Sequence, residues 1–129
     1  MGRYGPIRHF MDIEAWKIGR EIRKRVYAIV KRLPKEEQYC LGSQMRRAAI
    51  SVTANIAEGY GRYHYQENIQ FCRQSRGSLY ELQDHLITCL DEGYTPRQEY
   101  EEVYALTESG LKALNGYIRM LQKRKEGGK

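Results

Sequence analysis

Apolar residues recur every three or four positions along four stretches of the chain, and this period predicts four amphipathic helices and no strands. We expect helices over residues 12–33, 41–62, 65–91 and 96–125. The short connections between them predict an all-α, antiparallel up-down-up-down four-helix bundle. The expected core positions of the first, third and fourth helices are Ile13, Trp16, Gly19, Ile22, Val26, Ile29, Leu33, Ile69, Cys72, Leu79, Leu82, Leu86, Leu90, Tyr100, Val103, Thr107, Gly110, Leu111, Leu114, Tyr117 and Leu121.

Turn and cap residues mark the expected helix ends. Gly93 suits the end of the third helix, because glycine accepts the left-handed conformation of a C-terminal cap. Thr95 is the expected N-cap of the fourth helix, with Pro96 at the first helical position and Gln98 completing a capping box. The pair Gly77-Ser78 is expected to interrupt the third helix and to let a neighbouring helix approach closely.

The helix expected over residues 41–62 is apolar on two faces. Leu41, Met45, Ala48, Val52 and Ile56 form one face, and Ile50, Thr53, Ala54 and Ala57 form the other. A helix that is apolar on two sides needs two partners, and a short chain has only a limited core to offer. The second face therefore favours contact with another copy of the chain.

Polar residues lie among these apolar positions. Asn55 and Glu58 need hydrogen-bond partners if they are buried, and Arg46 or Arg47 is a candidate partner for Glu58. We interpret Arg47, Asn55 and Glu58 as a structural polar network that fixes helix register or subunit contacts. A catalytic role is the less favoured alternative, because no nucleophile–base pair or metal set accompanies them.

Four segments resemble a known family: FMDIEAWKIGREI, LPKEEQYCLGSQ, SQMRRAAISVTANIAEGYGR and GSLYELQDHL. In this order and spacing they are similar to the signature of the four-helix-bundle family named after the 23S rRNA intervening-sequence protein. The resemblance extends from about His9 to Lys123. It implies a ring-shaped homo-oligomer, a pentamer in this family, with a basic surface. It also implies a relation to the accessory variability protein of diversity-generating retroelements, whose expected partners are a reverse transcriptase and nucleic acid.

Composition adds limits. At 129 residues, 41% hydrophobic and 29% charged, the chain suits one globular domain. We expect an N-terminal arm over residues 1–11, the bundle over 12–125 and a disordered tail over 126–129. No apolar run is long enough to cross a bilayer and the N-terminus lacks a signal core, so a cytoplasmic location without membrane contact is expected. The three cysteines are expected to be free thiols, with Cys72 and Cys89 buried, and no cofactor or metal is expected.

Charge is unevenly distributed along the chain. Residues 1–65 hold 13 basic and 6 acidic side chains, whereas residues 66–129 hold 9 basic and 10 acidic ones. Lys17, Arg20, Lys24 and Lys31 share one outer face of the first helix, and Arg23, Arg25, Arg32 and Lys35 widen it. Regularly spaced cations suit a phosphate backbone without reading its sequence. A merely solvated face is an equally good interpretation.

The turn over residues 59–65 is a second candidate. Its aromatics alternate with Arg62 and His64, and Tyr63 is suited to stack on an exposed base. Its glycines would let the backbone come close to a phosphate. We favour the alternative that these tyrosines pack at the bundle end or at a subunit interface. The candidate nucleic-acid contacts are thus Lys17, Arg20, Arg23, Lys24, Lys31, Arg46, Arg47, Arg62 and Tyr63.

Acidic residues give the third helix the opposite character. Glu67, Glu81, Asp84 and Asp91 form an edge that is either solvated or suited to the basic first helix of a neighbouring subunit. A di-iron bundle would need Glu-x-x-His, which is absent from the sequence. The leading hypothesis is a non-enzymatic homo-oligomer that binds RNA or DNA. The alternative is a protein–protein adaptor with no direct nucleic-acid role.

Overall fold

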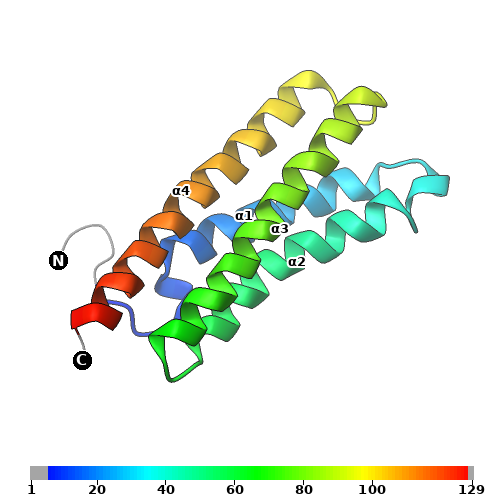
Figure 1. The fold of residues 1–129 in the computed structure, drawn as a ribbon. Helices are drawn as coiled ribbons and strands as arrows, with labels where there is room; N and C mark the ends of the chain where they lie inside the picture. Colours follow the sequence, from blue (N-terminus) through cyan, green and yellow to red (C-terminus); the bar gives the residue numbers. More distant parts are fainter. Residues whose placement is uncertain (1–5, 128–129) are drawn as a thin grey trace.

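A computed structural model describes residues 6–127, which form the predicted antiparallel bundle (Figure 1). Its elements are η1 (Phe10–Asp12), α1 (Glu14–Lys31), η2 (Lys35–Glu37), α2 (Leu41–Tyr60), α3 (Tyr65–Asp91) and α4 (Arg97–Gly127). Helix α1 packs against α2 and α4, and α3 packs against the same two helices. The outer faces of α1 and α3 therefore lie at opposite corners of the bundle.

The core confirms the predicted apolar stripes, except that Trp16, Leu90 and Tyr100 are only half-buried. Ile22, Val26, Met45, Leu82 and Leu114 are fully buried at the centre of one continuous cluster. Full burial of a side chain of this size contributes about 1.5–3 kcal/mol, so the stripes account for the helical packing. The core face of α2 is buried as expected, with Leu41 half-buried at its end. Both Cys72 and Cys89 are buried free thiols, which confirms that prediction.

The second face of α2 is only partly uncovered. Ile50 and Ala54 are exposed and Ala57 is half-buried, as a face awaiting a partner would be. Thr53, by contrast, is buried against α1, where its Oγ1 accepts a hydrogen bond from Arg23 at 2.9 Å. The expectation that Thr53 lies on the outer face is therefore wrong, because a polar partner on α1 lets it occupy the seam between the two helices.

The predicted helix ends are correct at Gly93 and wrong at Thr95. Gly93 has a φ of 74°, and the Tyr94 N–H donates back to the Cys89 carbonyl at 2.8 Å, which closes α3. Helix α4 begins one residue later than expected, since the Pro96 carbonyl accepts its first helical bond from Tyr100. Among residues 6–127, the buried Thr95 hydroxyl consequently has no hydrogen-bond partner, and Gln98 donates to Glu102 at 3.2 Å instead of completing a capping box.

Small residues permit close packing at positions other than the predicted one. Helix α3 runs without interruption through Gly77, where an added Cβ would meet no neighbouring side chain or helix within 4 Å. Close approaches occur at Gly19, where a Cβ would lie 3.0 Å from Val52 and Thr53, and at Gly59, where it would lie 2.7 Å from Asn68. The apolar period correctly places Gly19 on the core face, but it does not mark Gly59 as a close approach.

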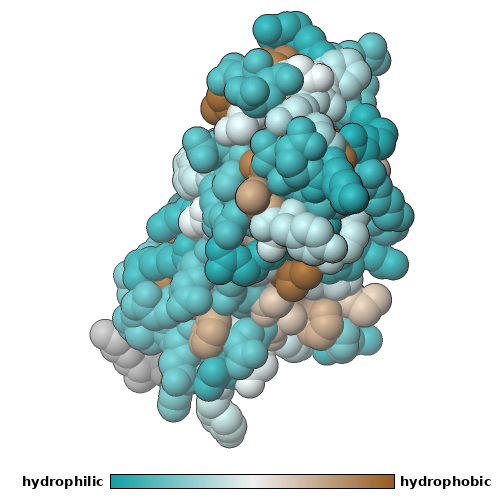
Figure 2. Space-filling view, turned by 90° about the vertical axis from the view of Figure 1, so that its right-hand side faces the viewer, coloured by the Kyte–Doolittle hydropathy of each residue, from teal (hydrophilic) through white to brown (hydrophobic). Residues whose placement is uncertain are grey.

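The chain ends are more ordered than predicted where the structure describes them. Phe10–Asp12 form a short helix capped by His9, and Glu126 and Gly127 continue α4. The rest of the expected arm and tail, residues 1–5 and 128–129, lies outside the described residues. None of the described helices is long and apolar enough to cross a membrane. Figure 2 shows a largely hydrophilic face with small separate apolar areas.

Candidate nucleic-acid interface

The outer face of α1 carries four exposed cations in one row. Lys17, Arg20, Lys24 and Lys31 follow each other at intervals of three, four and seven residues, and all four are exposed. The row is about 21 Å long, given the rise of 1.5 Å per helical residue. Within residues 6–127, none of the four has a carboxylate within ion-pairing distance. We call this row the α1 basic face.

Two neighbouring arginines have a different role. Arg25 donates to Glu102 at 2.8 Å, and Arg32 forms an ion pair with Glu99, so both join α1 to α4. The hydrogen bond from Arg25 holds the pKa of Glu102 below its usual value. The sequence predicts that these two arginines widen the basic face. In the structure they instead form ion pairs between α1 and α4. The cations of α1 therefore divide into two that are paired and a row that is not.

An aromatic side chain supports one end of the α1 basic face. The Arg20 guanidinium lies 5.9 Å from the centre of the Trp16 ring, at the outer limit of a cation–π contact. Trp16 in turn meets Phe10 edge to face, with ring centres 5.3 Å apart. A shallow groove is formed here by Met11, Trp16, Lys17, Arg20, Glu21 and Lys24. The periodicity of the sequence assigns Trp16 to the core and misses this groove, although the four-residue spacing to Arg20 is a usable signal.

The remaining predicted contacts do not join the α1 basic face. Arg23 is half-buried and turned toward Thr53. Arg46 is half-buried and donates to the Gln38 carbonyl at 3.2 Å, while the exposed Arg47 donates to Gln44 on its own helix. Of the predicted set, four residues therefore form one surface and the arginines of α2 have local structural partners.

The predicted polar network does not form within the described chain. Asn55 donates to Ser51, at 2.9 Å to its carbonyl and 2.7 Å to its hydroxyl, and Glu58 is exposed and paired with Arg62 at 2.9 Å. Arg47 and Glu58 are eleven residues apart, about 16 Å along one helix, which is too far for a direct contact. Ser51 continues the contact to α3, because the Ser78 hydroxyl donates to it at 2.8 Å.

In the turn over residues 59–65, some residues pack against the bundle and others are exposed to solvent. Gly59 lies against Asn68 and Phe71 of α3, so this glycine serves helix packing and not the predicted phosphate approach. The Arg62 guanidinium lies 4.8 Å from the Phe71 ring centre, in addition to its pair with Glu58. Tyr60 packs on the core as favoured, whereas Tyr63 is 96% exposed. Tyr63 is thus placed for stacking, while Arg62 is already engaged.

The outer face of α3 has the opposite chemistry. Tyr80, Asp84, Ile87 and Asp91 follow each other at helical spacing, and all four are exposed. Tyr80 is 56% and Ile87 41% exposed, and the two lie two helical turns apart on the same face. Beside them, Glu81 lies 3.0 Å from His85, one turn away. Among residues 6–127 no three His, Cys, Asp or Glu side chains are arranged to hold a metal ion.

Comparison with known proteins decides the family. The model of the 23S rRNA-intervening sequence protein family matches residues 11–116 of this chain. The chain belongs to this family. The match covers α1, α2, α3 and most of α4, so the family assignment rests on the whole bundle. No individually curated protein matches the sequence.

A solved structure confirms the fold of this family member. A protein of unknown function from the S23 ribosomal protein family of Bacteroides thetaiotaomicron superposes with a TM-score of 0.75. The two chains are 21% identical, and the match covers 81% of this chain and 95% of that one. At this identity the likeness concerns the bundle itself, and the chemistry of the surface has to be argued from the residues of this chain.

Proposed function

We propose that this protein is a non-enzymatic, homo-oligomeric scaffold that binds RNA or DNA through the α1 basic face. The observation that carries the proposal is the row of four exposed cations that have no ion pair with any described residue, next to two arginines that are paired. Cations that a fold does not use internally are available to phosphates, and each contact releases counterions. The row has no arrangement of side chains for reading bases, so binding is independent of sequence.

Assembly supports this role by repeating the α1 basic face around the oligomer. Ile50 on α2 is 46% exposed, and Tyr80 and Ile87 on α3 are exposed as well. We assign these two exposed faces to contacts with other copies of the chain, since exposed apolar side chains that lie together favour a protein interface. Because α1 lies at the corner opposite α3, such contact leaves the basic face open. A ring of copies then binds one strand at several points.

The test is equilibrium binding of a 30-nucleotide RNA of mixed sequence at 50 and 200 mM salt. With about four phosphate contacts per copy, the affinity of the wild type falls roughly 50- to 150-fold between these salt concentrations. Reversing Lys17, Arg20, Lys24 and Lys31 to Glu abolishes binding at 50 mM salt. Binding that is unchanged by this reversal removes the α1 basic face from the proposal.

A control variant with the same net charge separates the effect of the α1 basic face on RNA affinity from the effect of net charge. Arg73, Lys112, Arg119 and Lys123 are exposed, and none has an ion pair among the described residues. Reversing these four to Glu changes the net charge by the same amount, and it should leave most of the affinity intact. Equal losses in both variants would mean that only the overall charge matters. Light scattering of both variants checks that the oligomer persists.

A protein–protein adaptor is the second candidate, and the exposed Tyr80 and Ile87 favour it. In that case, the apolar face of α3 binds a different protein and the wild type is a monomer of 15.2 kDa in isolation. This adaptor is of the rRNA intervening-sequence type and has no direct nucleic-acid role, whereas a reverse transcriptase is the partner that the resemblance to retroelement accessory proteins implies for the scaffold. Salt-independent binding of one protein, without binding of RNA, would favour the adaptor.

A further inference from the structure

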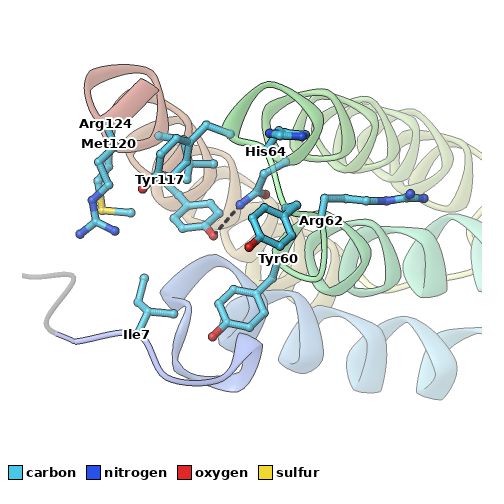
Figure 3. Close-up of a pocket in the computed structure, with 11 residues that line it drawn as sticks. Ile7, Tyr60, Arg62, His64, Tyr117, Met120 and Arg124 are labelled. Atoms are coloured by element: carbon cyan, nitrogen blue, oxygen red, sulfur yellow. Dashed lines mark hydrogen bonds between the residues drawn. The ribbon is translucent and has the colours of Figure 1, made fainter. Parts of the chain in front are cut away.

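A pocket lies at the end of the bundle where the α2–α3 turn, the end of α4 and Ile7 meet (Figure 3). Tyr60 and Tyr65 contribute aromatic walls, and Ile7 and Met120 contribute apolar ones. Asn68 and Tyr117 are its most deeply buried polar residues, at 7% and 2% exposed. The α1 basic face begins at this same end, because α1 and α3 both start here (Figure 1).

The buried polar pair leaves one donor unused. Asn68 Nδ2 donates to the Tyr117 hydroxyl at 3.2 Å, drawn as a dashed line in Figure 3. The hydroxyl hydrogen of Tyr117 itself has no acceptor among residues 6–127. Burial raises the pKa of Tyr117 to about 12, so the group stays a donor at neutral pH. A ligand atom in the pocket that accepts this hydrogen bond therefore meets a donor that is already held in place.

The local packing holds this pair in place. A Cβ at position 59 would lie 2.7 Å from Asn68 Oδ1, so only glycine leaves room for the Asn68 side chain here. The Cys72 thiol donates a weak hydrogen bond to the same oxygen, with Sγ 3.5 Å from it. Asn68 therefore has little freedom to turn, and it fixes the direction of the Tyr117 hydroxyl.

The rim of the pocket offers one free cation. Arg124 is exposed and has no carboxylate partner within residues 6–127. Arg62 also borders the pocket, but its guanidinium is engaged by Glu58 and the Phe71 ring, and in Figure 3 it points away. The site thus combines aromatic walls, one buried hydrogen-bond donor and one cation. That set matches a planar heteroaromatic ring with a single phosphate.

We propose that this pocket binds one unstacked base of a single-stranded nucleic acid, with the base between Tyr60 and Tyr65, an acceptor atom on the Tyr117 hydroxyl and the phosphate on Arg124. The inference rests on the proposed function, and it adds a preference for single strands. A base within a duplex cannot enter, because its faces and edges are covered by stacking and pairing. A strand that follows the α1 basic face reaches the pocket at the end of the helix.

The test compares a 12-nucleotide single-stranded RNA containing 2-aminopurine with a duplex of the same sequence. The wild type binds the single strand about tenfold more tightly than the duplex, as expected for one stacked base, and the fluorescence of 2-aminopurine changes. Tyr117→Phe weakens single-strand binding roughly three- to tenfold by removing one hydrogen bond, and Arg124→Gln weakens it similarly. Duplex binding is unchanged in both variants.

Matched controls lie outside the pocket. Tyr39→Phe alters an exposed tyrosine at the opposite end of the bundle, and Lys123→Gln removes a cation next to Arg124; neither changes the preference for the single strand. Thermal unfolding confirms that all variants are folded. Equal affinity for single strand and duplex overturns the pocket while leaving the proposed function intact, as does a preference that survives both pocket variants. Binding of adenosine monophosphate with the same variant sensitivity, but without a single-strand preference, overturns the assignment to a strand. Absence of binding to either RNA overturns both proposals.

Discussion

The outer faces of α1 and α3 occupy opposite corners of one bundle and differ in almost every respect. The α1 basic face carries four exposed cations and no exposed large apolar side chain between Lys17 and Lys31. The α3 outer face alternates Tyr80 and Ile87 with Asp84 and Asp91. Both faces have the same helical spacing, so the difference lies in chemistry alone. The fold therefore keeps a row of unpaired cations apart from a face of mixed apolar and acidic side chains.

The largest expected effect comes from the α3 face. Changing Tyr80 and Ile87 together to Asp places two charges at the assigned subunit contact, and both side chains are exposed, so the fold is retained. We expect light scattering to show the mass fall from that of an oligomer to 15.2 kDa, with unchanged helical circular dichroism. A variant that keeps the wild-type mass would show that copies meet elsewhere.

The next largest effect is expected in the salt dependence of RNA affinity, which should change with the α1 basic face and not with the outer face of α3. Changing Lys17, Arg20, Lys24 and Lys31 to Gln should reduce the slope of log affinity for RNA against log salt by about 3, since each phosphate contact contributes roughly 0.7–0.9. Changing Glu81 to Gln and Asp84 and Asp91 to Asn should leave that slope unchanged. Equal slopes for the two variants would contradict a polyanion surface confined to α1.

The buried side of α3 should make the free energy of unfolding depend on pH, whereas its outer face should affect only assembly. Burial raises the pKa of the Cys72 thiol from 9.0 to about 12, so the thiol stays protonated in the folded chain while it ionises in the unfolded one. Stability is therefore full below pH 9 and is lost as pH rises toward 12, by about 1.4 kcal/mol per pH unit for this group. Urea unfolding at pH 8 to 11 measures the loss. Cys72→Ala should lessen the slope; an unchanged slope would assign the loss to other groups, among them Cys89 and Tyr117.

The smallest effect is expected at the α1–α4 seam. Arg25→Gln and Arg32→Gln each remove one partly exposed ion pair, which should lower the free energy of unfolding by less than about 1 kcal/mol. RNA affinity should change less than about twofold, because these guanidinium groups are already occupied. A loss of RNA affinity as large as that of the variant with Lys17, Arg20, Lys24 and Lys31 changed to Gln would place the seam inside the binding surface.

The sequence alone predicts the bundle well, because burial of apolar stripes decides helix packing and leaves a clear period. It predicts the position of the α1 basic face for the same reason. It does not predict which cations are paired, since Arg25 and Arg32 meet glutamates 77 and 67 residues away. It also fails for Arg47, Asn55 and Glu58, whose side-chain partners lie three or four residues away along the chain. The pocket escapes sequence analysis because Ile7, Asn68 and Tyr117 come together only in the folded chain.

Lysine footprinting measures contact at the α1 basic face without any change to the amino-acid sequence. Lys17, Lys24 and Lys31 lie on the α1 basic face, while Lys112 and Lys123 are exposed on α4. The acetylation rate of each lysine is measured by mass spectrometry, with and without single-stranded RNA, at 50 mM and at 500 mM salt. The account predicts slower acetylation of the three α1 lysines at low salt, recovery at high salt and no change on α4. Equal protection of all five lysines, or protection of the α4 lysines alone, would contradict it.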